Sequence, residues 1–421
     1  MNDSPVLRQS SLRPRVPPIT GGTRQAVVAS SPSSFDSSVT EKFLSALLVL
    51  LVGTDLQYIA AVTPQLANGL NTTLTAVSYS LAMYAAAAVV AAALLRFSRQ
   101  HINQRMSLPL AAGVYSIACG LTAGSTGITV FLAGRALAGL AGGLISALAI
   151  TALAQGASYH KRGAQMTLIS VGYYLAPLAG VPLGVWLMTR HGWRMVFVIT
   201  GLFTGIAAIW LRRVSRVQQS EMISHSPPMI HNGHSASAWL GVVNAFFVSG
   251  GLVGLTAYIG TWLFDSLRAK PEDVSVVYAL INAGALAGGI LGGWLADRCG
   301  KRKVVQHATA AMLMGLLLLA SSARFVTEAE ILLVIITLVI FAAALRVAPL
   351  QALLTELVAP TQRASYIALR NLASQLGIGL GVLACGRLYQ SHGFAGVSAL
   401  CATFTAGAWL TIVAIREPEV R

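Results

Sequence analysis

The sequence predicts an all-α membrane protein, with twelve transmembrane helices in two pseudo-symmetric six-helix halves. Of the 421 residues, 55% are hydrophobic and only 10% are charged. Soluble domains carry about 25% charged residues, so this chain lacks the polar surface that a soluble fold needs. The apolar residues also fall into stretches of about 20, the length of a helix that crosses a bilayer.

Twelve such stretches follow one another along the chain, and a polar linker at residues 213–237 divides them into two groups of six. The expected spans are residues 43–65, 74–96, 106–124, 129–153, 163–189, 194–212, 238–264, 274–296, 304–323, 330–358, 364–389 and 396–415. The sequence therefore predicts an N-terminal bundle at 43–212 and a C-terminal bundle at 238–415. Residues 1–42, rich in Ser, Pro and Arg, are expected to be a disordered tail, and 416–421 a second tail.

Basic residues predict the orientation, because loops rich in Lys and Arg stay in the cytoplasm. With the first tail placed inside, about twenty Lys and Arg residues lie on the inner side. The outer loops contain Arg190, Arg194, Arg268, Lys270 and Arg324. Both termini are therefore expected in the cytoplasm, in a bacterial inner membrane. These loops also account for the net charge of +15, so nucleic acid is not an expected partner.

The two halves resemble each other in sequence. Residues 160–184 and 361–385 align without gaps, with Gly180 over Gly381. Repeated six-helix halves are typical of secondary transporters, which bind substrate between the repeats near the middle of the membrane. A membrane enzyme would need a nucleophile or a metal cluster, and the four cysteines fall in no such spacing. We therefore expect no enzymatic activity, cofactor or metal site.

Four stretches resemble motifs of the major facilitator superfamily. Residues 293–303 resemble its G-x-L-A-D-R-x-G-R/K-R/K signature through Gly293, Asp297, Arg298, Gly300, Lys301 and Arg302. The fourth-helix motif is matched by Arg135 and Gly139, and the fifth-helix antiporter motif by Gly180, Pro182 and Gly184. Asp55 stands where the drug:proton antiporter branch often has an acid. The resemblance covers nearly the whole chain and implies the twelve-helix fold, with the drug-antiporter or sugar-efflux branch most similar.

One stretch departs from the family pattern. The signature is usually best developed after the second span, where this chain has residues 96–105 without the acid or the glycine. The copy after the eighth span is thus expected to act as a cytoplasmic gate without an intact twin. Asp297 would approach the positive end of the fifth span near Gly163. Glu356 would meet loop bases such as Arg302 or Arg363. The alternative is that the basic loop serves only as a topology anchor.

Asp55 and Arg135 are the proton-coupling candidates, because charged side chains inside a membrane are costly and usually functional. Asp55 is the only acid within the spans of the first half. Pairing would lower the cost of each charge, and protonation of Asp55 would release Arg135. The alternative is that Arg135 extends outward to lipid phosphates.

Polar and amphipathic residues within the spans are candidates for a substrate cavity. Arg346 and Arg370 could each bind an anionic group, or form an internal structural pair. The candidates are Tyr84, Asn244, Tyr258, Trp262, Arg346, Arg370, Asn371 and Gln375.

The expected function is proton-coupled efflux of a small organic solute or drug by alternating access. Expected partners are this solute, protons and the lipid bilayer, and the protein is expected to be a monomer. Two alternatives of the same fold stay open: a proton-coupled permease for metabolite uptake, and a membrane sensor that has lost transport.

Overall fold

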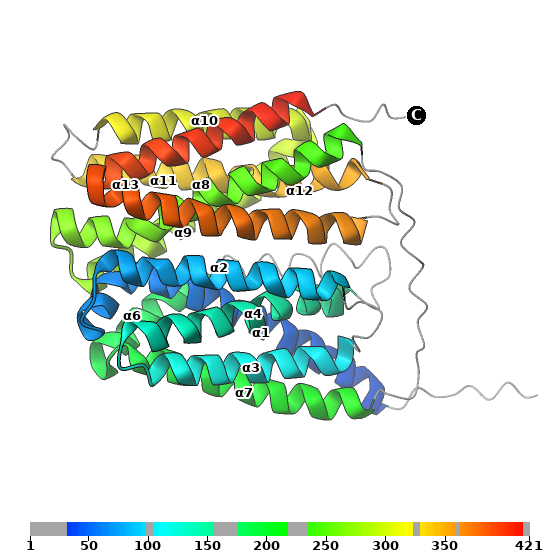
Figure 1. Cartoon of the computed structure of the whole chain (residues 1–421). Helices are drawn as coiled ribbons and strands as arrows, with labels where there is room; N and C mark the ends of the chain where they lie inside the picture. Colours follow the sequence, from blue (N-terminus) through cyan, green and yellow to red (C-terminus); the bar gives the residue numbers. More distant parts are fainter. Residues whose placement is uncertain are drawn as a thin grey trace, which may run out of the picture.

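The computed structural model describes residues 32–97, 104–154, 176–217, 235–322, 329–358 and 363–415. Every regular element in these ranges is a helix. The N-terminal half contains α1 (Pro32–Gly69), α2 (Leu74–Phe97), α3 (Gln104–Ala123), α4 (Ile128–Ala154), the π-helical turn η2 (Ala176–Gly180), α6 (Val181–His191) and α7 (Arg194–Val217). The C-terminal half contains α8 (Ala236–Leu267), α9 (Pro271–Cys299), α10 (Lys301–Ser322), α11 (Ala329–Leu345), α12 (Val347–Glu356) and α13 (Arg363–Ala414). Figure 1 shows the two halves as neighbouring bundles.

The helices follow the order of the twelve expected spans. Within the described ranges, 10 helical segments are long and apolar enough to cross a membrane. The last of these, α13, contains the final two expected spans, which meet at Gly393 with a φ of 61°. The fifth span is described from Ala176 onward, as η2 and α6. Helix α1 begins at Pro32, inside the segment expected to be a tail. Residues 1–31, the linker core at 218–234 and the tail at 416–421 lie outside the described residues.

Two interruptions of the helices lie beside prolines. Pro349 has no N–H to donate to the carbonyl of Leu345, four residues earlier, and the helix is interrupted at Arg346, between α11 and α12. Pro182 likewise cannot bond the carbonyl four residues before it, and the wider turn η2 directly precedes α6. Both interruptions fall within spans that carry candidate residues.

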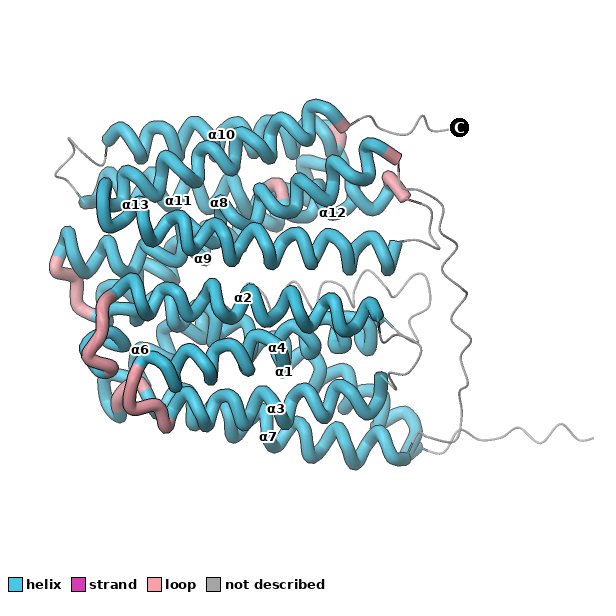
Figure 2. The backbone as a smooth tube through the Cα atoms, in the orientation of Figure 1, coloured by secondary structure: helices cyan, strands magenta, loops and turns pink. Residues whose placement is uncertain are grey.

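The halves contact each other more closely at one end of the bundle. We call the end where α1 starts, α7 ends, α8 starts and α13 ends the terminal end, on the right in Figure 2, and the opposite end the far end. One hydrophobic cluster combines residues of both halves at the far end, among them Ile59, Leu66, Ile259 and Trp262. We call this the shared cluster. Toward the terminal end, the N-half cluster (Leu44 to Leu211) and the C-half cluster (Ala238 to Ile415) each belong to one half alone.

Small residues bring helices together within the C-terminal half. A side chain at Gly288 or Gly292 of α9 would collide with the main-chain carbonyls of Phe341 or Leu345 in α11. This is the close approach that small residues four positions apart allow in membrane helices. Gly293 faces open space and takes no part in this contact.

Candidate functional site: a buried ion pair in the N-terminal half

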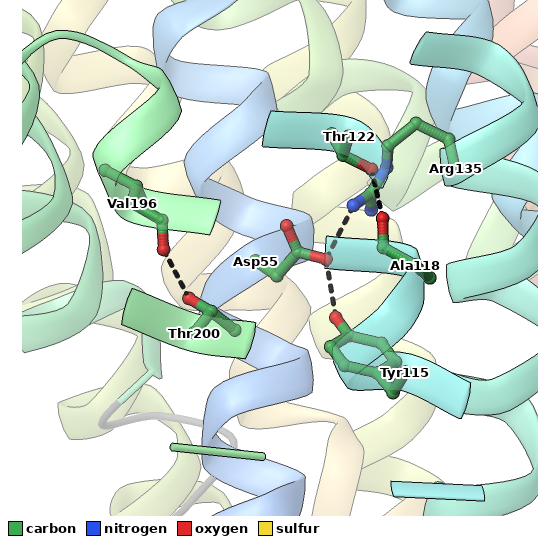
Figure 3. A network of polar contacts seen from close by, with 7 residues as sticks. All are labelled: Asp55, Tyr115, Ala118, Thr122, Arg135, Val196 and Thr200. Carbon is green, nitrogen blue, oxygen red and sulfur yellow. Dashed lines mark hydrogen bonds and ion pairs between the residues drawn. The ribbon is translucent and has the colours of Figure 1, made fainter. Parts of the chain in front are cut away.

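Asp55 and Arg135 form an ion pair inside the N-terminal half. Asp55 lies on α1 and Arg135 on α4, and Arg135 Nη1 donates to Asp55 Oδ2 over 2.7 Å. Their side chains are 2% and 0% exposed. Arg135 therefore does not extend to lipid phosphates in this state. Figure 3 shows the two side chains meeting between their helices.

Tyr115 is a third member of this site. It lies on α3, and its buried hydroxyl donates to the same oxygen, Asp55 Oδ2, over 2.5 Å (Figure 3). Asp55 Oδ1 has no hydrogen-bond partner among the described residues, and neither do Arg135 Nε and Nη2. The two donors thus hold one carboxylate oxygen and leave the other available to a proton or a water molecule.

Aromatic rings surround the guanidinium. The Arg135 Cζ atom lies 5.3 Å from the centre of the Tyr84 ring and 5.9 Å from that of Phe197. Cation–π contacts of this kind favour the charged form of an arginine in an apolar site. Tyr84, expected as a cavity residue, therefore belongs to the surroundings of the ion pair in this state.

The antiporter motif packs beside Asp55. A side chain at Gly180 would collide with Thr54, and one at Gly184 would lie 2.7 Å from the Tyr58 ring. Thr54 and Tyr58 stand on either side of Asp55 in the sequence of α1. The motif glycines therefore let the fifth span lie directly against the turn of α1 that carries the acid.

The signature loop after α9 contacts its own half. Gly300 has a φ of 90°, which glycine adopts without strain. Lys301 pairs with Glu356 of α12, and Arg302 Nη2 donates to the carbonyl oxygen of Val413 over 2.9 Å. Glu356 was expected to meet loop bases such as Arg302 or Arg363, and the base that it meets is Lys301, the first residue of α10.

Two further signature residues lie beside this loop. Arg298 stacks over Trp294 at 4.0 Å. Asp297 is exposed, and its expected partner region near Gly163 lies outside the described residues.

Three cavity candidates take part in helix packing in this state. Asn244 Nδ2 donates to the Ala408 carbonyl oxygen over 3.0 Å and to Thr411 Oγ1 over 2.8 Å. Tyr258 stacks on Tyr389 and Trp262 on Phe394, with ring centres 5.4 Å and 4.9 Å apart. Asn371 is exposed and Gln375 is half-buried. A role in substrate contact stays a prediction for all five candidates.

The two arginines of the C-terminal half differ in their surroundings. Arg370 Nη1 donates to Gln351 Oε1 over 2.8 Å, and its guanidinium lies over the Tyr366 ring. Arg346 is 1% exposed, and its Nε and Nη1 atoms have no partner among the described residues. Among all the residues that the structure describes, no three His, Cys, Asp or Glu side chains gather closely enough to hold a metal ion.

Sequence reasoning brought Asp55 and Arg135 together and did not find Tyr115. Charged residues are rare within the apolar spans, so the sequence offered few possible partners for each of the two. Tyr115 is one of 11 tyrosines. Nothing in the sequence of its own helix indicates that this tyrosine contacts Asp55, which lies 60 positions earlier.

Comparisons with known proteins agree with this architecture. A family model described as Major Facilitator Superfamily matches residues 45–264 and 238–421. An uncharacterized MFS-type transporter of Bacillus subtilis, YwfA, is 24% identical over 379 residues, covering 88% of this chain and 90% of that protein. A chloramphenicol resistance protein of Streptomyces lividans is 25% identical over 333 residues, covering 77% and 83%.

One solved structure is similar over nearly the whole length. It is a bacterial homolog of the human lysosomal transporter Spinster, in an inward-facing and unoccupied conformation. The TM-score is 0.65 at 16% sequence identity, with 92% of this chain and 94% of that chain covered. At this identity the likeness concerns the fold.

Proposed function

Because this chain belongs to the major facilitator superfamily and is a membrane transporter of small molecules, we propose that it exports an organic solute in exchange for protons. The observation that carries the proposal is the buried Asp55–Arg135 pair with Tyr115. A carboxylate enclosed within a membrane protein is a group that can take up and release a proton during transport.

Protonation of Asp55 would act through Arg135. While Asp55 is ionised, its charge offsets the guanidinium charge in a site closed to water. A proton on Asp55 removes this compensation and leaves a buried cation unpaired, which costs several kcal/mol. A cost that differs between two transport states shifts the balance between them. Proton uptake can therefore drive the halves from one arrangement to the other.

The packing of the two halves supports alternating access. The shared cluster closes the far end, while the N-half and C-half clusters stay separate at the terminal end. The excess of basic loop residues favours placing the terminal end in the cytoplasm. In that orientation this state would receive a solute from the cytoplasm.

Two observations favour export over uptake. The glycines of the antiporter motif pack against the turn of α1 that carries Asp55. A relative similar over 77% of this chain is described as a chloramphenicol resistance protein. Uptake of a metabolite is the competing function, and the direction of pH-driven flux separates the two.

Transport by reconstituted protein tests the proposal. A solute that raises the melting temperature (Tm) of the purified protein is loaded into proteoliposomes, and its movement is followed under an imposed pH gradient. We expect uphill movement coupled to proton flow in the wild type and none in Asp55→Asn. Asp265→Asn, which changes an exposed acid at the far end, is the matched control and should transport normally.

A stability measurement shows whether a loss of transport in Asp55→Asn is caused by misfolding. Asp55→Asn leaves Arg135 without its counter-charge, so Tm should fall, and adding Arg135→Gln should restore part of the loss. The double variant should fold and still fail to couple solute to protons. Undiminished uphill transport in Asp55→Asn would remove Asp55 from the mechanism. Binding of solutes without any flux in the wild type would favour the sensor.

A further inference from the structure

Arg346 carries a charge that no described residue compensates. Its side chain is 1% exposed at the interruption between α11 and α12. It makes no side-chain hydrogen bond, ion pair or ring contact with the residues that the structure describes. An ion buried in this way without a partner is strongly destabilising.

Among the described residues of the C-terminal half, no acid is placed to neutralise it. Glu356 lies ten residues further along the span, about 15 Å away at the rise of a helix, and already pairs with Lys301. Glu330 lies at the opposite end of the same span, roughly 24 Å from Arg346. The remaining acids that the structure describes in this half lie near helix ends: Asp265, Glu272, Asp273 and Asp297.

The N-terminal half does not supply the missing charge either. Its buried acid, Asp55, is held by Arg135 and Tyr115. Across the described part of the chain, the buried charged side chains are one carboxylate and three guanidiniums: Asp55, Arg135, Arg346 and Arg370. The interior thus holds an excess of positive charge.

The place of Arg346 in its span suits a ligand. It lies roughly at the middle of the tenth span, the depth at which secondary transporters bind substrate next to interrupted helices. It also stands at the start of α12, and the N-terminal end of a helix favours negative charge. Arg370 is less available, because its Nη1 already donates to Gln351 and its guanidinium lies over the Tyr366 ring.

We propose that Arg346 binds an anionic group of the transported solute, a carboxylate, sulfonate or phosphate. This inference rests on the proposed transport function and narrows it to organic anions. The solute would supply the counter-charge that the protein lacks. Since the guanidinium is closed to solvent in this state, the anion would be bound within the protein and not on its surface.

Anion-dependent stabilisation of the purified full-length protein tests this inference. The probes are four pairs, each an anion with an uncharged counterpart: benzoate and benzamide, benzenesulfonate and benzenesulfonamide, phenyl phosphate and phenol, and glucuronate and glucose. Tm is measured against concentration at constant ionic strength. We expect at least one anion to raise the Tm of the wild type more than its counterpart does. In Arg346→Gln its apparent affinity should fall at least tenfold.

Two further variants make the result specific. Arg387→Gln removes an exposed charge of α13 in the same half and should keep the anion effect unchanged. Arg346→Lys keeps the charge and should retain part of the affinity, which also covers a failure of Arg346→Gln to fold. Equal stabilisation by the anions and their counterparts in the wild type would overturn the proposal, as would an unchanged affinity in both Arg346 variants. Because binding is measured without a pH gradient, this outcome is independent of whether Asp55 couples protons.

Discussion

Gln390 of α13 donates a hydrogen bond from Nε2 to Thr75 Oγ1 of α2 over 2.8 Å and so joins the two halves at the far end. Nearby, Gly386 lies against Tyr258, Thr75 and Tyr79. The two halves are therefore joined at the far end by a hydrogen bond and a close helix contact as well as by the shared cluster. At the terminal end, by contrast, the contacts that Arg298, Lys301 and Arg302 make with described residues lie within the C-terminal half. The far end is therefore the closed side of this state.

The first prediction concerns this closed side. A side chain at Gly260 of α8 would lie 2.6 Å from the carbonyl oxygen of Ala60 in α1. Gly260→Val should therefore disfavour closure of the far end by about 1–3 kcal/mol, the usual cost of overpacking. The ratio of the state closed at the far end to the state closed at the terminal end should fall at least about fivefold.

Cys299 reports this shift. It is exposed at the terminal end, while Cys119, Cys385 and Cys401 are buried. A membrane-impermeant maleimide applied at the terminal end should label Cys299 more slowly in Gly260→Val. Gly113→Val is the matched control, because its side chain enters open space. The same labelling rate in Gly260→Val and the control would mean that the Gly260 contact does not hold the far end closed.

The second prediction compares two buried tyrosines. Tyr115→Phe removes the hydroxyl that donates to Asp55 Oδ2. Since hydrogen bonds to charged groups contribute about 1.5–3 kcal/mol, its free energy of unfolding should fall by about that amount. Tyr58→Phe removes a buried hydroxyl that has no hydrogen-bond partner among the described residues, so its stability should stay within about 0.5 kcal/mol of the wild type. Denaturant unfolding in detergent measures both. Equal losses in the two variants would contradict the assigned role of the Tyr115 hydroxyl.

The difference between Arg135 and Tyr115 explains which contacts of the site can be predicted from the sequence. Arg135 could be matched with Asp55 because charges within apolar spans are rare and each needs a partner. The hydroxyl of Tyr115 makes no such demand, since a tyrosine in a span can equally pack among apolar side chains. Finding its partner requires the packing of α3 against α1 and α4.

The same distinction holds for the fold. Lengths of apolar runs predict the order of the spans, because the bilayer thickness sets the length of each helix. They do not predict the π-helical turn before Val181 or the closure of the far end. Local geometry of this kind depends on which side chains of the other helices fill the space. Likewise, the loop bases were expected near Glu356, but the choice of Lys301 depends on the turn at Gly300.

The third prediction concerns the fifth span. Gly184→Leu would drive a large side chain into the ring of Tyr58, three residues after Asp55. It should shift α6 away from α1 and reduce transport strongly, while the protein still inserts in the membrane. Leu183→Ala is the control. Leu183 is exposed on the same helix, so this variant should transport normally. Flux is measured in proteoliposomes containing equal amounts of inserted protein. Wild-type flux in Gly184→Leu would exclude a need for close packing here.

The last prediction concerns Asp297, the signature acid near the end of α9. A gate residue must make a contact that exists in one transport state only, since a contact equal in both states shifts nothing. Asp297 is exposed here, in a state whose hydrophobic clusters toward the terminal end each belong to one half, as expected if its contact forms when that end closes. A charge facing a helix end contributes about 0.3–1 kcal/mol, and up to about 2 kcal/mol when partly buried.

Loss of the upper value would change the ratio of states by roughly thirtyfold. Asp297→Asn should therefore favour the terminal-open state, and the maleimide should label Cys299 faster than in the wild type. Glu272→Gln changes an exposed acid at the other end of α9 and should leave the labelling rate near that of the wild type. Since residues 96–105 lack the acid of a second signature, no equivalent contact in the first half would mask the effect. Unchanged labelling and unchanged transport in Asp297→Asn would reduce the loop to a topology anchor.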